Sequence, residues 1–126
     1  MKKRAFTLLE ILIVVGIIAL LVGLISFSYS SAQKKARDSR RKSDLKAVQS
    51  ALEQYYSVCS YTYPQTLSGG VICAAVDPTV AIMPSIPVDP KTGVAYVITP
   101  GAGTSYTLCT TLEAESPTNY CLSNQQ

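Results

Sequence analysis

The chain has 126 residues, of which 48% are hydrophobic and 15% charged, so it is long enough for one small domain and too short for most multi-domain enzymes. The charged share lies well below the usual value of about 25%, which indicates a membrane segment joined to a soluble part. Charge is also divided unevenly: ten basic against three acidic residues give +7 over residues 1–46, whereas one against five gives −4 over residues 47–126.

The first 27 residues have the composition of a basic leader followed by a membrane helix. Residues 6–27 are interrupted by polar side chains only at Thr7, Glu10 and Ser26, and as a helix they would extend roughly 33 Å, enough for a hydrocarbon core of about 30 Å. A secretory signal peptide, cleaved near residues 30–32, is the competing interpretation. Glu10 argues against it, because a carboxylate carried to mid-membrane costs about 2.5–3.5 kcal/mol unless a partner compensates it.

Residues 3–10, KRAFTLLE, running directly into an aliphatic stretch, resemble the N-terminal signal of type IV pilins and type II secretion pseudopilins. The resemblance is specific over about the first quarter of the chain. It implies that a prepilin peptidase cleaves between Ala5 and Phe6 and methylates the new amino group of Phe6, and that Glu10 acts in filament assembly. Ala5 stands where the family usually has Gly, and no Pro occurs before Pro64.

The same resemblance implies partners and a location. The partners are the prepilin peptidase, other copies of the chain in a helical filament, minor pilins, an inner-membrane assembly platform and the membrane itself. The chain would first span the cytoplasmic membrane once, with its bulk extracytoplasmic. It would then join a filament at the cell surface or in the periplasm.

Beyond residue 27 the pattern predicts that the helix continues as an amphipathic helix to about Ser57. Small or apolar residues recur at spacings of mostly three and four: Ile25, Tyr29, Ala32, Ala36, Leu45, Val48, Leu52 and Tyr55. One helix from Phe6 to Ser57 would be roughly 78 Å long, with its first half in lipid or against neighbouring helices and its second half presenting a stripe to a small domain.

Residues 33–44 carry a basic cluster and no strong apolar stripe, so we expect a solvated stretch between membrane and domain. Asp38 is spaced to pair with Lys34 or Arg41, and Asp44 with Arg40. The number of positive charges alone would place this flank in the cytoplasm. We give more weight to the cysteines and the N-terminal signal. We favour a solvated helix face, because no aromatic residues are interleaved with the basic ones. The alternative is that this cluster binds nucleic acid or anionic lipid.

The C-terminal part is rich in turn signals between residues 61 and 103, so it cannot be mainly helical. Residues 94–99 and 105–110 read as short strands joined by residues 100–104, and residues 119–122 add a third. Residues 87–90, PVDP, with Tyr96 beyond, are similar to the turn before the first strand of major pseudopilins.

The predicted fold class is therefore α+β and pilin-like: one long N-terminal helix, its first half transmembrane, packed on a small antiparallel sheet with disulfides. We divide the chain into four parts. Residues 1–5 form a leader and residues 6–27 a transmembrane and assembly helix. Residues 28–57 continue the helix as an amphipathic segment, and residues 58–126 form a small β-rich extracytoplasmic domain.

The four cysteines indicate two disulfides in an oxidising compartment, since no pair has the C-x-x-C spacing of zinc or redox sites. Three pairings are open. We favour Cys59 with Cys73 and Cys109 with Cys121, because each closes a short loop, and a disulfide over such a loop contributes roughly 3 kcal/mol in a small domain.

No catalytic constellation can be assembled, because the chain has no His, and Glu113 and Glu115 are expected to be solvated at a strand exit. We therefore predict that the protein is not an enzyme and binds no cofactor. The family resemblance suggests a calcium site in a C-terminal loop, in which Asp77 and Asp89 would be oxygen ligands. Each precedes a Pro, and we favour a role in starting a turn over a metal site.

Two function classes remain open. The first is a filament subunit of a type IV pilus or of a type II secretion or competence pseudopilus. The second is a secreted or membrane-tethered, disulfide-bonded binding module that never polymerises. The mass of the mature N-terminus separates them, since a methylated Phe6 supports the first class and a start at Gln33 the second.

Overall fold

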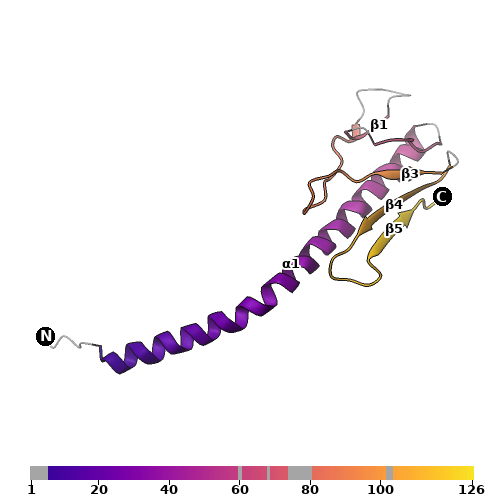
Figure 1. The fold of residues 1–126 in the computed structure, drawn as a ribbon. Helices are drawn as coiled ribbons and strands as arrows, with labels where there is room; N and C mark the ends of the chain where they lie inside the picture. Colours follow the sequence, from indigo (N-terminus) through magenta and orange to yellow (C-terminus); the bar gives the residue numbers. More distant parts are fainter. Residues whose placement is uncertain (1–5, 60, 68, 74–80, 102–103) are drawn as a thin grey trace. The chain divides into compact units, whose positions relative to one another are not determined.

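The computed structural model describes residues 6–59, 61–67, 69–73, 81–101 and 104–126. The predicted leader and Asp77 lie outside these residues. Within them, one long helix is followed by five short strands (Figure 1). Contacts divide the chain into two compact units, Met1–Lys34 and Lys35–Gln126.

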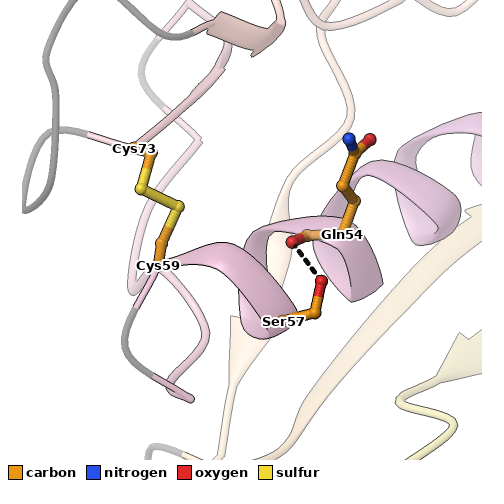
Figure 2. Close-up of a disulfide and its surroundings, with 4 residues drawn as sticks. All are labelled: Gln54, Ser57, Cys59 and Cys73. Carbon is orange, nitrogen blue, oxygen red and sulfur yellow. Dashed lines mark hydrogen bonds between the residues drawn. A yellow bond between two sulfur atoms is a disulfide. The ribbon is translucent and has the colours of Figure 1, made fainter.

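Helix α1 runs from Leu8 to Val58, within two residues of the predicted bounds. Local hydrogen bonds close its C-terminal end: the Ser57 hydroxyl donates to the Gln54 carbonyl over 2.9 Å (Figure 2), the Cys59 amide donates to the Tyr55 carbonyl over 2.7 Å, and the Tyr61 amide donates to the Tyr56 carbonyl over 3.2 Å. Tyr61 has a φ of 55°, in the left-handed region that ends helices. The chain therefore turns away from the helix axis directly after α1.

The second unit contains two antiparallel sheets. Strands β1 (Val71–Ile72) and β2 (Ala81–Met83) form one, and β3 (Ile98–Pro100), β4 (Tyr106–Thr111) and β5 (Asn119–Ser123) form the other in the order β3-β4-β5. The sequence predicted β4 and β5 within one or two residues. It did not predict β1 or β2.

The strand predicted at residues 94–99 is wrong in extent, because only Ile98 and Thr99 of that range join the ladder. The reason is a turn immediately before it. The Gly93 amide donates to the Asp89 carbonyl over 2.9 Å, and the φ of 68° at Gly93 is one that a glycine adopts without strain. Ala95 is then limited to a single bridge with Val88.

The core of the second unit lies between α1 and the β3-β4-β5 sheet, which runs along the C-terminal part of the helix (Figure 1). Leu45, Val48 and Leu52 are fully buried, as their spacing predicts, and each contributes about 1.5–3 kcal/mol. On β4, Tyr106 and Leu108 face this core, while Thr107 between them is exposed. The α+β fold class is confirmed. The earlier members of the predicted stripe, Ile25, Tyr29, Ala32 and Ala36, are exposed.

Two disulfides link parts of this unit, with the pairing that the loop lengths favour. Cys59, just after α1, bonds to Cys73 beside β1 (Figure 2), and both residues are buried. Cys109 on β4 bonds to Cys121, the residue directly opposite on β5, and both are exposed. One bond therefore joins the helix end to a loop, and the other crosses a ladder that is already hydrogen-bonded.

Candidate functional site

The first site is the N-terminal end of α1, where Thr7 and Glu10 form a capping box. The Glu10 amide donates to the Thr7 hydroxyl oxygen over 3.2 Å. In return, the Thr7 amide and hydroxyl donate to the Glu10 carboxylate over 3.1 and 3.2 Å. This pattern satisfies donors that a helix start leaves unpaired, and explains why α1 begins at Leu8. It also shows that the Glu10 side chain has hydrogen-bond partners within its own chain.

Phe6, the predicted new N-terminus, is 80% exposed, while Ala5 lies outside the described residues. The apolar segment that follows meets the length and hydropathy criteria for a membrane span from Leu8 to Ile25, with a mean hydropathy of 3.1. None of its residues is buried within the chain. An apolar helix without a core of its own requires lipid or other helices around it.

A second cluster, which the sequence analysis missed, lies on the part of α1 that was expected to be solvated. We call it the ion-pair cluster and define it as Arg37, Asp38, Arg41, Asp89, Lys91 and Glu113. Asp38 and Arg41 are buried, and Glu113 is largely so. The prediction of a solvated stretch over residues 33–44 is therefore wrong for these positions, as is that of a solvated Glu113.

Arg41 lies at the centre of the cluster. Its guanidinium donates to Asp38 over 2.9 Å and to Asp89 through two nitrogens, and a nitrogen lies 2.9 Å from Glu113. Hydrogen bonding to Asp89 is the main reason that the pKa of Arg41 is raised, against the opposing effect of its burial. The same contact lowers the pKa of Asp89. Arg41 therefore stays charged and holds three carboxylates together.

Asp38 attaches the helix to the segment after β4. Its carboxylate accepts the backbone amides of Glu113, over 2.9 and 3.0 Å, and Ala114, over 2.7 Å. Burial acts to raise the pKa of Asp38, but the two amides and Arg41 outweigh it, so the pKa is lowered. The buried carboxylate is thus ionised and has all its partners nearby.

Glu113 completes the cluster from the loop side. Arg37 binds it through two nitrogens, over 2.9 and 2.7 Å, and Lys91 over 3.2 Å. The hydrogen bonds from Arg37 are the main cause of the lowered pKa of Glu113. Three cations and three carboxylates balance within the cluster. Nearby, Lys42 pairs with Glu115, which is exposed as predicted.

A signal for the cluster exists in the sequence. Asp38 and Arg41 precede Leu45, Val48 and Leu52 at spacings of three and four, so all five residues lie on one face of the helix. The sequence analysis expects no strong apolar stripe over residues 33–44, because charged side chains, including those of Asp38 and Arg41, dominate this segment. The ion pairs predicted from helical spacing are confirmed for Asp38 with Arg41, and for Arg40 with Asp44 at 3.9 Å.

Two tyrosines and Asp89, one of the two candidate calcium ligands, have structural roles. Glu53 accepts the hydroxyls of Tyr63, over 3.0 Å, and Tyr106, over 2.8 Å, and burial together with these bonds raises the pKa of both phenols. Asp89 accepts the amides of Lys91 and Thr92, over 2.8 and 2.9 Å, which is the predicted turn-starting role. Among the described residues, no group of three or more His, Cys, Asp or Glu is placed to hold a metal ion.

Comparison with known proteins accounts for both the N-terminal segment and the domain. The family described as prokaryotic N-terminal methylation motif matches residues 1–26. The chain is 30% identical to the type II secretion system core protein G of Escherichia coli (strain K12) over 116 residues, which cover 85% of this chain and 79% of that protein. The chain belongs to this pseudopilin family.

The pseudopilin also resembles the type II secretion system core protein G of Pseudomonas aeruginosa, with 34% identity over 68 residues that cover 54% of this chain and 47% of that protein. No solved structure gives a significant match. The family is structural rather than enzymatic, which confirms the prediction drawn from the absence of a catalytic constellation. It also favours the filament-subunit class over the non-polymerising binding module.

Proposed function

We propose that this pseudopilin is a structural subunit of a type II secretion pseudopilus. A prepilin peptidase cleaves it between Ala5 and Phe6 and methylates the Phe6 amine. The subunit spans the cytoplasmic membrane once, with its C-terminal domain on the extracytoplasmic side, and then polymerises through its N-terminal helix. Its partners are other copies of itself, minor pseudopilins and the inner-membrane assembly platform.

The exposed apolar segment from Leu8 to Ile25 is the observation that carries this proposal. A stretch with a mean hydropathy of 3.1 and none of its residues buried has no place in water. Lipid surrounds it before assembly, and the helices of neighbouring subunits replace lipid in the filament. The C-terminal domain does not use this apolar segment for its own core, which lies between the later part of α1 and the sheet.

Glu10 gives the assembly its register. In the single chain its carboxylate is bonded by Thr7, which satisfies part of its hydrogen-bonding capacity but leaves its charge uncompensated. When apolar helices pack together, an unpaired charge among them is costly. The methylated Phe6 amine of an adjacent subunit remains cationic and supplies the compensating charge. This pairing requires one axial stagger between neighbours.

Three substitutions of Glu10 separate charge from capping. Glu10→Gln keeps a side-chain oxygen that can complete the capping box but removes the charge, Glu10→Ala removes both, and Glu10→Asp keeps the charge on a shorter side chain. We expect the Gln and Ala variants to insert and fold at normal levels and to form no filaments as the sole major subunit, while the Asp variant is less impaired. Electron microscopy of sheared fractions, with membrane blots for subunit level, measures both properties.

Normal filaments from Glu10→Gln would mean that Glu10 acts only as a helix cap, and the register argument would fail. Absent subunit in all three variants would assign Glu10 to insertion instead. The mass of the mature wild-type chain tests processing independently. A methylated Phe6 terminus is expected, and a terminus at Gln33 would return the chain to the class of secreted binding modules.

A further inference from the structure

Strand β5 forms one edge of the three-stranded sheet (Figure 1), and its pairing with β4 determines which of its backbone groups face outward. The Leu112 amide donates to the Thr118 carbonyl over 2.6 Å. In an antiparallel ladder, hydrogen-bonded and non-hydrogen-bonded pairs alternate, so every second residue counted from Thr118 bonds to β4. The residues between them direct their amides and carbonyls away from the sheet: Asn119, Cys121 and Ser123.

This outer edge of β5 is open and lacks the usual protections. Among its outward backbone groups, only the Ser123 carbonyl has a hydrogen-bond partner within the described residues, and it accepts the Gln49 side-chain amide over 2.7 Å. Proteins usually protect an exposed edge with proline, charged residues or a bulge. The sequence of β5, NYCLS, contains neither proline nor charge, and its pairing with β4 is regular. On the opposite edge, β3 ends in Pro100. Another strand can therefore add to β5.

The Cys109–Cys121 disulfide keeps this edge in place. It joins residues directly opposite each other on β4 and β5, with Cα atoms 4.1 Å apart, and both residues are exposed. A strand that binds at β5 therefore cannot shift the register of β5 or pull it away from β4. Because the edge is ordered before binding, less free energy is lost in ordering it when a partner arrives.

The flank of α1 beside β5 carries an unpaired positive charge. The Lys42 ammonium lies 5.5 Å from the centre of the Tyr120 ring, and Gln49 binds Ser123. These contacts are about 10 Å apart on both the helix and the strand, so the two elements run alongside each other. Lys46 is one turn after Lys42 and within about 60° of both helix residues around the axis, so it lies beside the same edge. It is exposed and has no ion pair with any residue that the structure describes.

The other basic residues of this part of α1 do not serve the edge. Lys34 and Arg40 each project about 120° away from Lys46 around the helix. Lys35 is on the same flank, but it lies about 16 Å before Lys46 along the helix axis, beyond the start of β5. Lys42 is already paired with a carboxylate of the domain. Lys46 is therefore the cation beside β5 that a partner can neutralise.

We propose that the free edge of β5 and Lys46 form a docking site for an extended acidic segment of another protein, which adds to the sheet as a fourth strand. Hydrogen bonds to the backbone of Asn119 and Cys121 bind the segment, and one of its carboxylates pairs with the Lys46 ammonium. A second copy of the chain fits the site less well, because antiparallel pairing of two β5 edges would bring two Lys46 ammonium groups to one interface. The site lies entirely in the second unit, so it depends neither on membrane anchoring nor on filament assembly.

The test measures the fluorescence anisotropy of a labelled peptide with the full chain in non-ionic detergent. The probe is a terminally blocked heptapeptide of alternating threonine and glutamate. The matched probe has the same sequence with all of its backbone amides N-methylated, which removes its donors but keeps its charge. We expect the first peptide to bind and the second not to bind. Lys46→Gln should weaken binding about fivefold, the upper range for one exposed charge pair. Arg40→Gln removes a charge from another side of the helix and should leave binding unchanged.

A substitution in β5 tests the edge directly. Asn119→Pro removes an outward amide at the first residue of the strand, a position that proline tolerates, and should abolish binding of the probe. Asn119→Ala keeps the amide and should bind as the wild-type chain does. Circular dichroism checks that both variants melt with the wild type. If Asn119→Pro does not, the N-methylated peptide answers the same question without a change in the chain.

Equal binding of the two peptides would overturn the proposal, since charge alone would then explain binding, and so would equal losses from Lys46→Gln and Arg40→Gln. Failure of the wild-type chain to bind the unmethylated peptide would overturn it as well. Sedimentation of the full chain without peptide tests the alternative occupant. Self-association that Asn119→Pro removes and Asn119→Ala does not would assign the edge to a second copy of the chain instead.

Discussion

Arg41 occupies a position where a helix that packs on a sheet normally has an apolar side chain. It is 3% exposed and has three carboxylates around it, while Arg40, the residue before it, is 68% exposed and, among the residues that the structure describes, pairs only with Asp44, at 3.9 Å. Taking charges out of water is expensive, and a buried cluster is tolerated only when its members are fully paired. Loss of Arg41 should therefore lower the free energy of unfolding far more than loss of Arg40, although the two side chains are chemically identical.

Replacing Arg41 with Met should destabilise the domain by about 3 kcal/mol, because Asp38, Asp89 and Glu113 would be left close together without their central cation. This loss corresponds to a fall of more than about 10 °C in the midpoint of thermal unfolding for a domain of this size. Circular dichroism of the full chain in non-ionic detergent measures it. Arg40→Met is the matched control and should change stability by less than about 0.5 kcal/mol. Equal effects of the two substitutions would contradict the central role of Arg41.

At the scale of elements, the ion-pair cluster attaches α1 to the segment after β4 and to the turn at Asp89. The apolar core attaches the same helix to the sheet from Leu45 onward. The charged contacts thus extend the interface by two helical turns toward the N-terminus. Their strength depends on the ionisation of carboxylates, so this part of the interface responds to pH while the apolar part does not.

Acid should weaken the domain through this cluster. Asp38, Asp89 and Glu113 have pKa values lowered in the folded state, mainly by Arg41, Arg37 and backbone amides, whereas in the unfolded chain they titrate near about 4. The unfolded state then binds more protons below that pH, so stability is fully present above about pH 5 and falls as the pH decreases further.

The melting temperature of the full chain between pH 7 and pH 2 measures this dependence. We expect a plateau down to about pH 5 and a decline below it, with a shallower decline in Arg41→Met and an unchanged one in Arg40→Met. A wild-type profile without a decline would show that the carboxylates are not held by the cluster.

The helix and its apolar stripe could be predicted from the sequence because both depend on local periodicity. The same holds for β4 and β5, whose alternation is regular, as at Tyr106 and Leu108. The strand at residues 94–99 could not be placed correctly, since its start depends on how the turn through Gly93 pairs Val88 with Ala95. The burial of Asp38 depends on backbone amides 75 and 76 residues away, which no local pattern reveals.

At the scale of the whole molecule, the two compact units hold different tasks. Met1–Lys34 contains the N-terminal methylation motif, Glu10 and the apolar span, and Lys35–Gln126 contains the core, the ion-pair cluster and both disulfides. Damage to the folding of the second unit should therefore leave membrane insertion and processing of the first intact. The disulfides offer a way to test this separation.

Removal of either disulfide should destabilise the domain without preventing insertion or cleavage. Each bond closes a loop of 12 to 14 residues, for which the loss of chain restraint in the unfolded state amounts to about 3 kcal/mol. The Cys59→Ala/Cys73→Ala variant should lose more than the Cys109→Ala/Cys121→Ala variant, because the first pair is buried and its removal also leaves a cavity, whereas the second pair is exposed. Peptide mapping without reduction must first recover these two pairs from the wild-type chain.

Denaturant unfolding in detergent then ranks the two double variants, and the mass of the membrane-bound chain reports whether each is processed to Phe6. We expect normal processing in both variants and fewer filaments in the less stable one, because a domain that unfolds is lost to proteolysis before it can be assembled. If the Cys59→Ala/Cys73→Ala chain remained unprocessed in the membrane, the peptidase would require a folded domain. The tasks of the two units would then be coupled rather than separate.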